Sequence, residues 1–369
     1  MCMKVPVNEP VVTDAAKRYV MDALNTGWIS SAGEYLERFE REFAGYIGMK
    51  HAVSTTNGTT ALHLALAGLG IGKGDEVIVP DFTIISCMNA VLYTGATPVF
   101  VDVDPETFTL NPDLLEAGIT RKTKAIMPVH IYGHSCDMDP ILEIAEKHGL
   151  FVVEDAAEVH GATYKGRKCG SMGTVSAFSF YSNKIVTTGE GGMVLTNDDR
   201  FAQEMRLLVN LAHSPGKRFW HEKVGFNYRL TNLQAALGLG QLQNIEEFLA
   251  HKKWLGEEYT RRLSDIEGLI LPVTRDYAKN VYWMYSLRVS DVLGLTRDEL
   301  CRRLKERGVD TRTFFIPLSS QPIAKKYRRK ECPVSASIAA SGFYLPSGLA
   351  LTGEQMEYVC NAVHEVLSA

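Results

Sequence analysis

The chain has 369 residues, 46% of them hydrophobic and 22% charged, which is typical of a folded protein long enough for two domains. A formal net charge of −4 excludes the basic surface of nucleic-acid-binding proteins, and no apolar run approaches the roughly 20 residues of a membrane span. The N-terminal residues lack the apolar core of a signal peptide, so we expect a cytoplasmic protein without a nucleic-acid or membrane partner.

The first 50 residues are expected to form two helices. Thr13 can cap a helix from Asp14 to Leu24, and a second amphipathic run extends from Glu34 to Tyr46. Neither segment carries a residue type that indicates chemistry.

From residue 51 on, predicted strands alternate with predicted helices. We expect strands at 51–54, 76–79, 98–103, 125–129 and 151–154, with helices between them at 59–69, 84–93, 112–118 and 140–148. This alternation predicts an α/β fold with a mostly parallel sheet, helices on both of its faces and a ligand site at the carboxyl ends of the strands.

The first junction between a strand and a helix is a candidate anion site. Backbone N–H groups of Gly58 and Thr59 would be unpaired at the helix start, where the helix dipole also attracts negative charge. On this stretch alone, a plain helix cap with a glycine turn is the simpler interpretation. It matches neither the dinucleotide-binding nor the P-loop pattern, which disfavours nicotinamide and nucleotide-triphosphate enzymes.

Metal and nucleophile chemistry find no support. His130 and His134 are four residues apart, but Gly133 lies between them and no His-Glu-x-x-His motif or cysteine cluster accompanies them. We therefore interpret both histidines as pocket or core residues and expect no metal. The seven cysteines include no Cys-x-x-Cys pair, which favours reduced thiols, and there is no Gly-x-Ser-x-Gly nucleophile motif.

The predicted strand at 151–154 runs into acidic residues. The carboxylate at the carboxyl end of a buried parallel strand faces the ligand crevice of such a sheet, so Asp155 is the best candidate to pair with a cationic group on a ligand. An acid that caps the following turn remains an equal alternative. A surface hairpin is expected next, at 162–168.

The stretch from Phe178 to Gly192 begins as a strand and continues into a lysine and a glycine cluster. Lys184 would then lie at the strand end, packed among Phe178, Phe180 and Tyr181. Burial there would lower the pKa of the amine, as a Schiff-base lysine requires. A solvated surface lysine is the alternative on this stretch alone.

The rest of the chain predicts a second, smaller domain. A strand at 193–196 and a helix at 198–211 precede a polar loop, and a helical region at 231–263 leads to α+β structure with strands near 269–271 and 282–289. Thr296 and Thr352 open helices with capping boxes. We place the two domains at 1–245 and 246–369.

The candidate residues of the first domain meet the requirements of one cofactor. Pyridoxal phosphate needs amides and hydroxyls for its phosphate, an acid for its ring nitrogen and an amine for its aldehyde. The chain resembles, over nearly all its length, the DegT/DnrJ/EryC1/StrS sugar aminotransferases, which have the fold of type I pyridoxal-phosphate enzymes. The motifs that carry this resemblance are Asn-Gly-Thr-Thr-Ala-Leu-His-Leu-Ala-Leu at 57–66, Gly-Asp-Glu-Val-Ile-Val-Pro at 74–80, Glu-Asp-Ala-Ala-Glu at 154–158, Phe-Ser-Phe-Tyr-Ser-Asn-Lys at 178–184, Thr-Gly-Glu-Gly-Gly at 188–192 and Phe-Asn-Tyr-Arg-Leu-Thr-Asn at 226–232.

The resemblance implies a role for each matching residue. Lys184 would form the Schiff base, Asp155 would hold the proton of the ring nitrogen, and Glu158 would lie near the phenolic oxygen of the ring. The phosphate would be bound by Ser179 and by the amides of Gly58 and Thr59. Asn227 would reach the phosphate of the neighbouring subunit's cofactor, so the resemblance implies a homodimer with shared active sites.

Two positions depart from the family's pattern. Relatives usually stack an aromatic residue on the cofactor ring where this chain has Ile84, so the stacking is either aliphatic or supplied by Phe82. Glu158 replaces the more usual neutral amide, and a carboxylate beside a phenolate should be protonated or held apart.

The implied reaction is the transfer of the amino group of L-glutamate to a ketone on a nucleotide-linked sugar. Further motifs at 28–31, 128–134 and 136–141 resemble members that aminate C4 of GDP-4-keto-6-deoxymannose. A dTDP- or UDP-linked keto-sugar is an alternative substrate. Lys184 argues against the family's dehydratases, which have histidine in its place, and a non-catalytic sensor would need a further domain.

Overall fold

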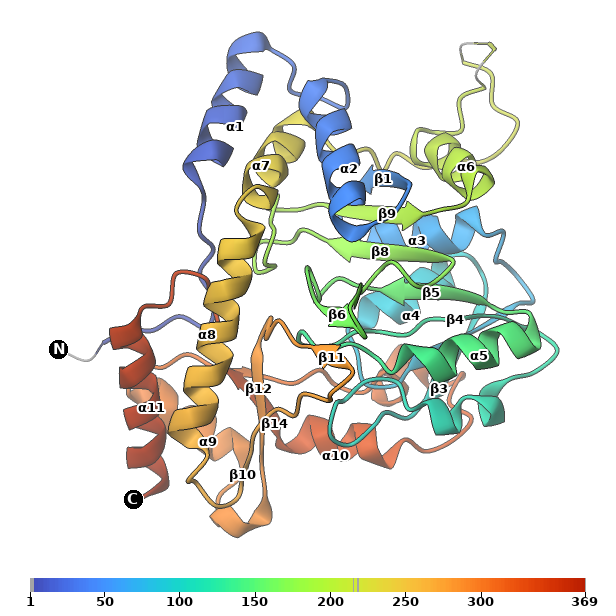
Figure 1. Ribbon diagram of the computed structural model, residues 1–369. Helices are drawn as coiled ribbons and strands as arrows, with labels where there is room; N and C mark the ends of the chain where they lie inside the picture. The colour runs from blue at the N-terminus through green and yellow to red at the C-terminus, as the bar shows by residue number, and fades with distance from the viewer. Residues whose placement is uncertain (1–2, 215, 218, 369) are drawn as a thin grey trace.

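The computed structural model describes residues 3–368 except 215 and 218, and its centre is a seven-stranded sheet (Figure 1). The strand order is β1-β9-β8-β5-β4-β2-β3. Strand β9 runs antiparallel to both of its neighbours, while every other adjacent pair is parallel. The strands are β1 His51–Thr55, β2 Glu76–Pro80, β3 Thr97–Val101, β4 Thr123–Ile126, β5 Phe151–Asp155, β8 Val175–Ser179 and β9 Gly192–Thr196. The prediction of a mostly parallel α/β sheet is confirmed.

Helices cover both faces of this sheet, because alternate strand residues point to opposite sides. Val77 belongs to the core beneath α3, α4 and α6, whereas its neighbour Ile78 belongs to the core shared with α2, α5 and α7. Helix α1 packs against α7. The helices are α1 Asp14–Thr26, α2 Glu34–Ile47, α3 Gly58–Gly68, α4 Ile85–Tyr93, α5 Met138–His148, α6 Asp199–Val209 and α7 Asn232–Leu242.

A second sheet, with strand order β10-β12-β14-β13, forms the smaller unit. Its core includes residues of the long helix α8, which also reaches the core of the large sheet through Phe248. Helix α8 therefore joins both units (Figure 1). The elements are α8 Ile245–Leu263, β10 Leu269–Ile270, β12 Tyr285–Val289, α9 Arg297–Glu306, β13 Arg312–Thr313, α10 Pro333–Ser341, β14 Gly342–Leu345 and α11 Gly353–Leu367. The domain boundary at 245/246 stays a prediction.

Several element predictions need correction. The helix expected at 112–118 is two short 3-10 turns, Pro112–Leu114 and Glu116–Gly118, since seven residues are too few for a stable α-helix. The helical region at 231–263 is broken at 243–244 into α7 and α8. The hairpin at 162–168 is present as β6 Thr163–Tyr164 and β7 Arg167–Lys168, and β11 Ala278–Lys279 pairs with it.

Two further observations concern the whole described chain. None of its helices combines the length and apolarity needed to cross a bilayer. The six described cysteines are free thiols: Cys87, Cys136, Cys169, Cys301, Cys332 and Cys360.

Candidate active site

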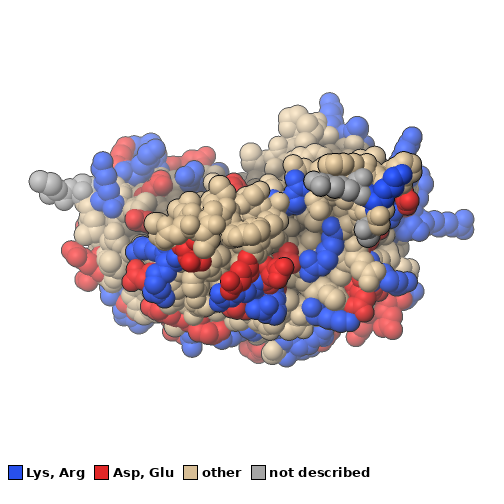
Figure 2. Space-filling model, turned by 90° about the horizontal axis from the view of Figure 1, so that it is seen from above, with Lys and Arg blue, Asp and Glu red and all other residues tan. Residues whose placement is uncertain are grey.

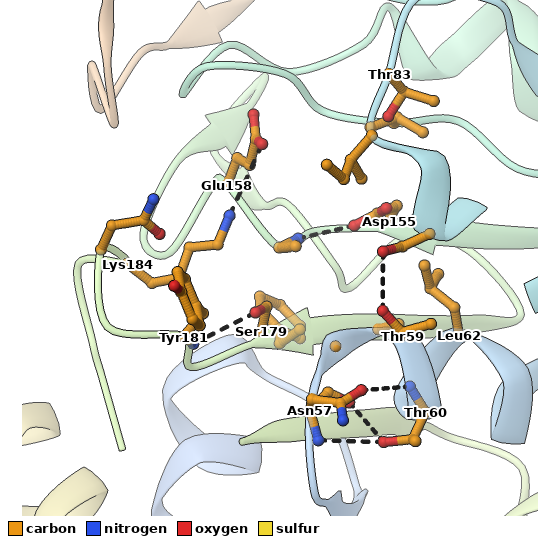
Figure 3. A pocket seen from close by; sticks show the side chains of 18 of the residues that line it. Asn57, Thr59, Thr60, Leu62, Thr83, Asp155, Glu158, Ser179, Tyr181 and Lys184 are labelled. Atoms are coloured by element: carbon orange, nitrogen blue, oxygen red, sulfur yellow. Dashed lines mark hydrogen bonds and ion pairs between the residues drawn. The ribbon is translucent and has the colours of Figure 1, made fainter. Parts of the chain in front are cut away.

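A cavity of about 600 Å³ opens at the carboxyl ends of β5 and β8, beside the start of α3 (Figure 3). This is the edge of the sheet where a ligand site was predicted. The structure brings six of the seven predicted site residues to this cavity: Gly58, Thr59, Asp155, Glu158, Ser179 and Lys184.

The start of α3 is built to bind an anion. The side chain of Asn57 accepts the N–H of Thr60, and its carbonyl accepts the N–H of Ala61. Among the described residues, no acceptor is recorded for the N–H groups of Gly58 and Thr59, so these two donors are available to a ligand at the positive end of the helix dipole.

Hydroxyl groups surround this helix start. Thr59 Oγ1 donates to Ser86 Oγ at 2.8 Å, and Ser179 closes the cavity from the end of β8. A Cβ atom on Gly58 would lie 2.7 Å from Ser179 Cβ, so only glycine allows this close approach. Ser86, in the first turn of α4, was missed in the sequence because no motif contains it.

Asp155 is the last residue of β5 and is 2% exposed. Its Oδ1 accepts the backbone N–H of Ala157 at 3.1 Å, and its Oδ2 accepts the thiol of Cys87 at 3.1 Å. These contacts orient the carboxylate at the cavity wall, as predicted for an acid facing the ligand. Asp155 also caps the turn after β5, because it accepts the N–H of Ala157, as the alternative interpretation of this residue expected. Cys87, from α4, is a second residue that the sequence did not single out.

Lys184 lies in the turn after β8, five residues beyond the strand's end at Ser179, so its placement at the strand end needs correction. Burial lowers the pKa of its amine, the direction that we expected. The Nζ atom lies 3.7 Å from Glu158 Oε1 (Figure 3). The predicted aromatic neighbours are incomplete, because Trp283, far along the sequence, places its ring centre 3.7 Å from Nζ.

Glu158 is held close to Lys184 and away from water. Its Oε2 accepts the backbone N–H of Tyr132 at 2.8 Å. Burial raises the pKa of the Glu158 carboxyl to about 7, and the attraction of Lys184 limits this rise. The carboxyl can therefore hold a proton near neutral pH, as the sequence reasoning required for an acid beside a phenolate.

The structure distinguishes the two residues considered for ring stacking. Ile84 lines the cavity and is 38% exposed. Phe82 is fully buried in an aromatic cluster with Phe108 and Phe314, and it is not among the cavity residues. The aliphatic alternative is therefore the one that this geometry favours.

The two histidines considered as ligands are core residues. His130 Nε2 lies 3.0 Å from Glu154, and its Nδ1 accepts the N–H of Cys136. His134 Nε2 accepts the N–H of Arg275, and burial lowers the pKa of this imidazole to about 4. Both rings are thus committed to hydrogen bonds inside the protein.

Asn227 does not line the cavity of its own chain. It is an exposed residue of the loop before α7, joined to Asn210 by a single bridge. Its predicted contact with a neighbouring subunit's site stays a prediction.

The groups that line the cavity fit pyridoxal phosphate. The free amides of α3 and the nearby hydroxyls suit a phosphate dianion, the oriented Asp155 suits a protonated ring nitrogen, and the buried Lys184 amine suits an aldehyde. Trp283, Phe315 and Tyr344, all from the second sheet's unit, complete the wall. These three residues belong to no motif and could not be found without the structure.

Sequence comparison places the chain among sugar aminotransferases. The model of the DegT/DnrJ/EryC1/StrS aminotransferase family matches residues 10–364. The GDP-perosamine synthase of Caulobacter vibrioides is 46% identical over 365 residues, 99% of this chain and 98% of the relative. The GDP-perosamine synthase of Escherichia coli O157:H7 is 41% identical, covering 99% of each chain. The dTDP-3-amino-3,4,6-trideoxy-alpha-D-glucose transaminase of Streptomyces venezuelae is 41% identical over 96% of this chain and 91% of its own.

Solved structures agree with this result. DesV of S. venezuelae superposes with a TM-score of 0.92 at 39% identity, covering 99% of both chains. Spr1654 of Streptococcus pneumoniae, in its PLP form, gives a TM-score of 0.93 at 27% identity, again over 99% of each chain.

Proposed function

The chain belongs to the DegT/DnrJ/EryC1/StrS aminotransferase family, and we propose that it aminates C4 of GDP-4-keto-6-deoxy-D-mannose with L-glutamate as donor, giving GDP-perosamine. The protein is a pyridoxal-phosphate-dependent sugar aminotransferase. The substrate is supported by identity of 46% to a GDP-perosamine synthase over nearly the whole of both chains. The class of reaction is supported by one observation of the site, the meeting of Lys184, Asp155 and the α3 start in one cavity.

Pyridoxal phosphate supplies an aldehyde that accepts an amino group and a ring that withdraws electrons from the reacting carbon. The amides of Gly58 and Thr59 and the hydroxyl of Ser179 would bind its phosphate, and the Asp155 carboxylate would keep the ring nitrogen protonated. Lys184 Nζ would hold the aldehyde, and as a free amine it would be the base that carries a proton to and from the donor's α-carbon.

Glu158 assists Lys184 in this proposal. Its carboxyl lies 3.7 Å from the amine, so in its ionised form it stabilises the ammonium group that Lys184 becomes when it holds a proton. The cavity wall from the smaller unit, with Trp283, Phe315 and Tyr344, limits water around these groups.

The proposal includes a homodimer with shared active sites in the cytoplasm. Asn227 is exposed and lies outside its own cavity, where it can reach a second subunit. Large apolar side chains are exposed as well, including Trp28 at 59% and Val224 at 85%. Seen from above, uncharged residues cover the upper part of the middle of the view, and acidic and basic residues lie below them (Figure 2). Free thiols on the described cysteines fit a reducing compartment.

A panel of keto-sugars tests the substrate. The protein is loaded with pyridoxamine phosphate and mixed with GDP-4-keto-6-deoxy-D-mannose, a dTDP-linked 4-keto-6-deoxy sugar or a UDP-linked one. We expect the absorbance of the pyridoxal form to return at least about tenfold faster with the GDP sugar, because each lost nucleotide contact costs a factor of this order.

A dTDP-linked substrate is the second candidate, favoured by 41% identity to the S. venezuelae transaminase. Faster return of the absorbance with the dTDP sugar would replace the first proposal with this one. Lys184→Ala serves as the control, since it should bind the cofactor phosphate but show no turnover with any sugar.

A further inference from the structure

The amine of Lys184 contacts an aromatic face as well as a carboxylate. The ring centre of Trp283 lies 3.7 Å from Nζ, the same distance that separates Nζ from Glu158 Oε1. Trp283 is 4% exposed and precedes β12, so it comes from the smaller unit. An indole face attracts a cation through the ring quadrupole, more strongly where water is excluded.

Trp283 is fixed at three other points. Its Nε1–H donates to the carbonyl of Asn183 at 2.8 Å, which anchors the peptide directly before Lys184. Its own carbonyl accepts a hydrogen bond from the buried Lys252 at 2.9 Å. Its ring lies nearly parallel to that of Tyr132, with 16° between the planes and 6.3 Å between the centres. The indole therefore cannot turn away without breaking several contacts.

The turn that carries Tyr132 connects Trp283 to Glu158. Tyr132 has a left-handed backbone, with φ of 53°, and its N–H donates to Glu158 Oε2. A Cβ on the next residue, Gly133, would lie 2.7 Å from Trp283 N. Tyr282, the neighbour of Trp283, is also left-handed, with φ of 45°. Two unfavourable backbone conformations are thus maintained where these segments meet at the lysine.

The charges around Lys184 come from several elements. The titratable groups that act on its amine are Asp155 at the end of β5, Glu158 and His160 in the loop after β5, and Cys87 on α4. His160 Nδ1 accepts the N–H of Val186, and burial lowers the pKa of this imidazole to about 3, so it stays neutral. Among the described residues, the Lys184 amine nitrogen contacts two groups, the carboxylate of Glu158 and the indole ring of Trp283.

We propose that Trp283 is the positioning residue of Lys184. Its indole face stabilises the cationic nitrogen beside Glu158, and its Nε1–H fixes the Asn183 peptide, so the smaller unit sets both the proton affinity and the alignment of the lysine. This inference rests on the assignment of Lys184 as the cofactor-binding lysine in the proposed function.

The test is a pH titration of the holoenzyme. The absorbance of the resting cofactor–lysine adduct is recorded from pH 5 to 10 for wild type, Trp283→Phe and Trp283→Leu. Leucine removes the aromatic face, and we expect the titration midpoint to fall by about one pH unit, since the protonated nitrogen loses its cation–π contact. Phenylalanine retains a weaker face and should shift the midpoint by about half as much. Both variants lose the Nε1–H anchor, so kcat should fall about tenfold or more.

Three controls separate the possible results. Trp254→Leu, on the exposed side of α8 at 37% exposure, should titrate like wild type. Borohydride reduction and peptide mapping locate the modified lysine independently of any Trp283 effect, and thermal melting reports folding. An adduct that maps to Lys184 with an unshifted midpoint in a folded Trp283→Phe or Trp283→Leu protein would overturn the positioning role alone. An adduct that maps to another lysine would overturn the Lys184 assignment as well.

Discussion

Asp155 is the carboxylate that we propose pairs with the ring nitrogen of the cofactor. Its Oδ1 accepts the N–H of Ala157 and its Oδ2 accepts the thiol of Cys87. An asparagine can keep the first bond with its amide oxygen and donate its NH2 to the Cys87 sulfur, so it can hold the same position. Asp155→Asn removes the charge that, in the proposed function, would hold a proton on the ring nitrogen. We expect kcat to fall about 100-fold or more, as for other single electrostatic groups at an active site. Rapid-mixing measurement of the glutamate half-reaction checks this.

Asp199→Asn is the control for Asp155→Asn, because it removes the same charge from a surface carboxylate far from the cavity. Asp199, on α6, pairs with Lys50 and His51 at the surface, and its side chain is 57% exposed. Asp199→Asn should therefore leave kcat within about twofold of wild type. Turnover of Asp155→Asn close to wild type would show that its charge is not used.

The sequence could predict those site residues that lie in short, recognisable segments. Asp155 ends one buried strand and Lys184 comes five residues after the end of another, so local patterns and topology place both at one edge of the sheet. Ser86 lines the cavity and Cys87 contacts Asp155, and both come from α4 without any motif. Trp283 lies 99 residues after Lys184 and meets it only because the smaller unit packs over the cavity, a long-range contact that no local pattern reports.

At the scale of elements, the fit of α3 against β8 shapes the proposed phosphate site. Because a Cβ on Gly58 would lie 2.7 Å from Ser179 Cβ, Gly58→Ala must push the helix start away from the strand end. The two free amides then move away from the phosphate. We expect the dissociation constant for pyridoxal phosphate to rise about tenfold or more, a loss of the size of one good hydrogen bond to a charged group. Fluorescence titration of the cofactor measures it.

Gly45 provides the matched control for this substitution. It lies inside α2, and a Cβ there would meet nothing within 4 Å. Gly45→Ala should stabilise the protein by up to about 1 kcal/mol through helix propensity and leave cofactor affinity unchanged. Equal affinities for the Gly58→Ala and wild-type proteins would contradict the close-approach argument.

Helices with a regular apolar repeat were predicted correctly from the sequence, whereas a strand that exists only through its tertiary contacts was not predicted. The helices α1, α2 and α5 begin and end within two residues or so of their expected bounds, since their apolar faces repeat regularly. Strand β14 was not predicted, because its short run Gly342–Leu345 follows the α10 helix without a turn signal. It pairs with β12 and β13 and is part of the smaller unit's sheet only through these partners.

At the scale of the whole molecule, a buried lysine lies between the two units. Lys252 of α8 is 1% exposed and donates to the carbonyls of Trp283 and Ser347, and burial lowers its pKa to about 7. Below pH 7 both folded and unfolded chains hold the proton, and the cost of the buried charge is constant. Between pH 7 and about 10 only the unfolded chain holds it, so the folded state becomes more stable as pH rises.

Lys252→Met removes this dependence. In urea unfolding, the stability of wild type minus that of the variant should rise by on the order of 1 kcal/mol per pH unit between about pH 7 and 10, and stay level below it. Lys253→Met, which changes the exposed neighbouring lysine, should show no such slope. A level difference for Lys252→Met would mean that the lysine stays charged in the folded protein.

Asn227 is the residue through which an active site shared between two subunits can be tested. Asn227 is exposed and lies outside the cavity of its own chain, whereas Lys184 lies inside it. In a dimer with shared sites, each site would combine Lys184 of one subunit with Asn227 of the other. Lys184→Ala and Asn227→Asp should each be inactive, the first for want of an amine and the second because a carboxylate repels the phosphate.

Mixing these two inactive proteins should restore activity. In a mixed dimer, one site receives the lysine of the Asn227→Asp chain and the asparagine of the Lys184→Ala chain, so it is intact. Random exchange of equal amounts makes half of the dimers mixed, and each has one good site of two, which gives about a quarter of wild-type activity. Native mass spectrometry of tagged chains verifies the exchange. A verified mixture without activity, or an active isolated monomer, would show that Asn227 serves only its own loop.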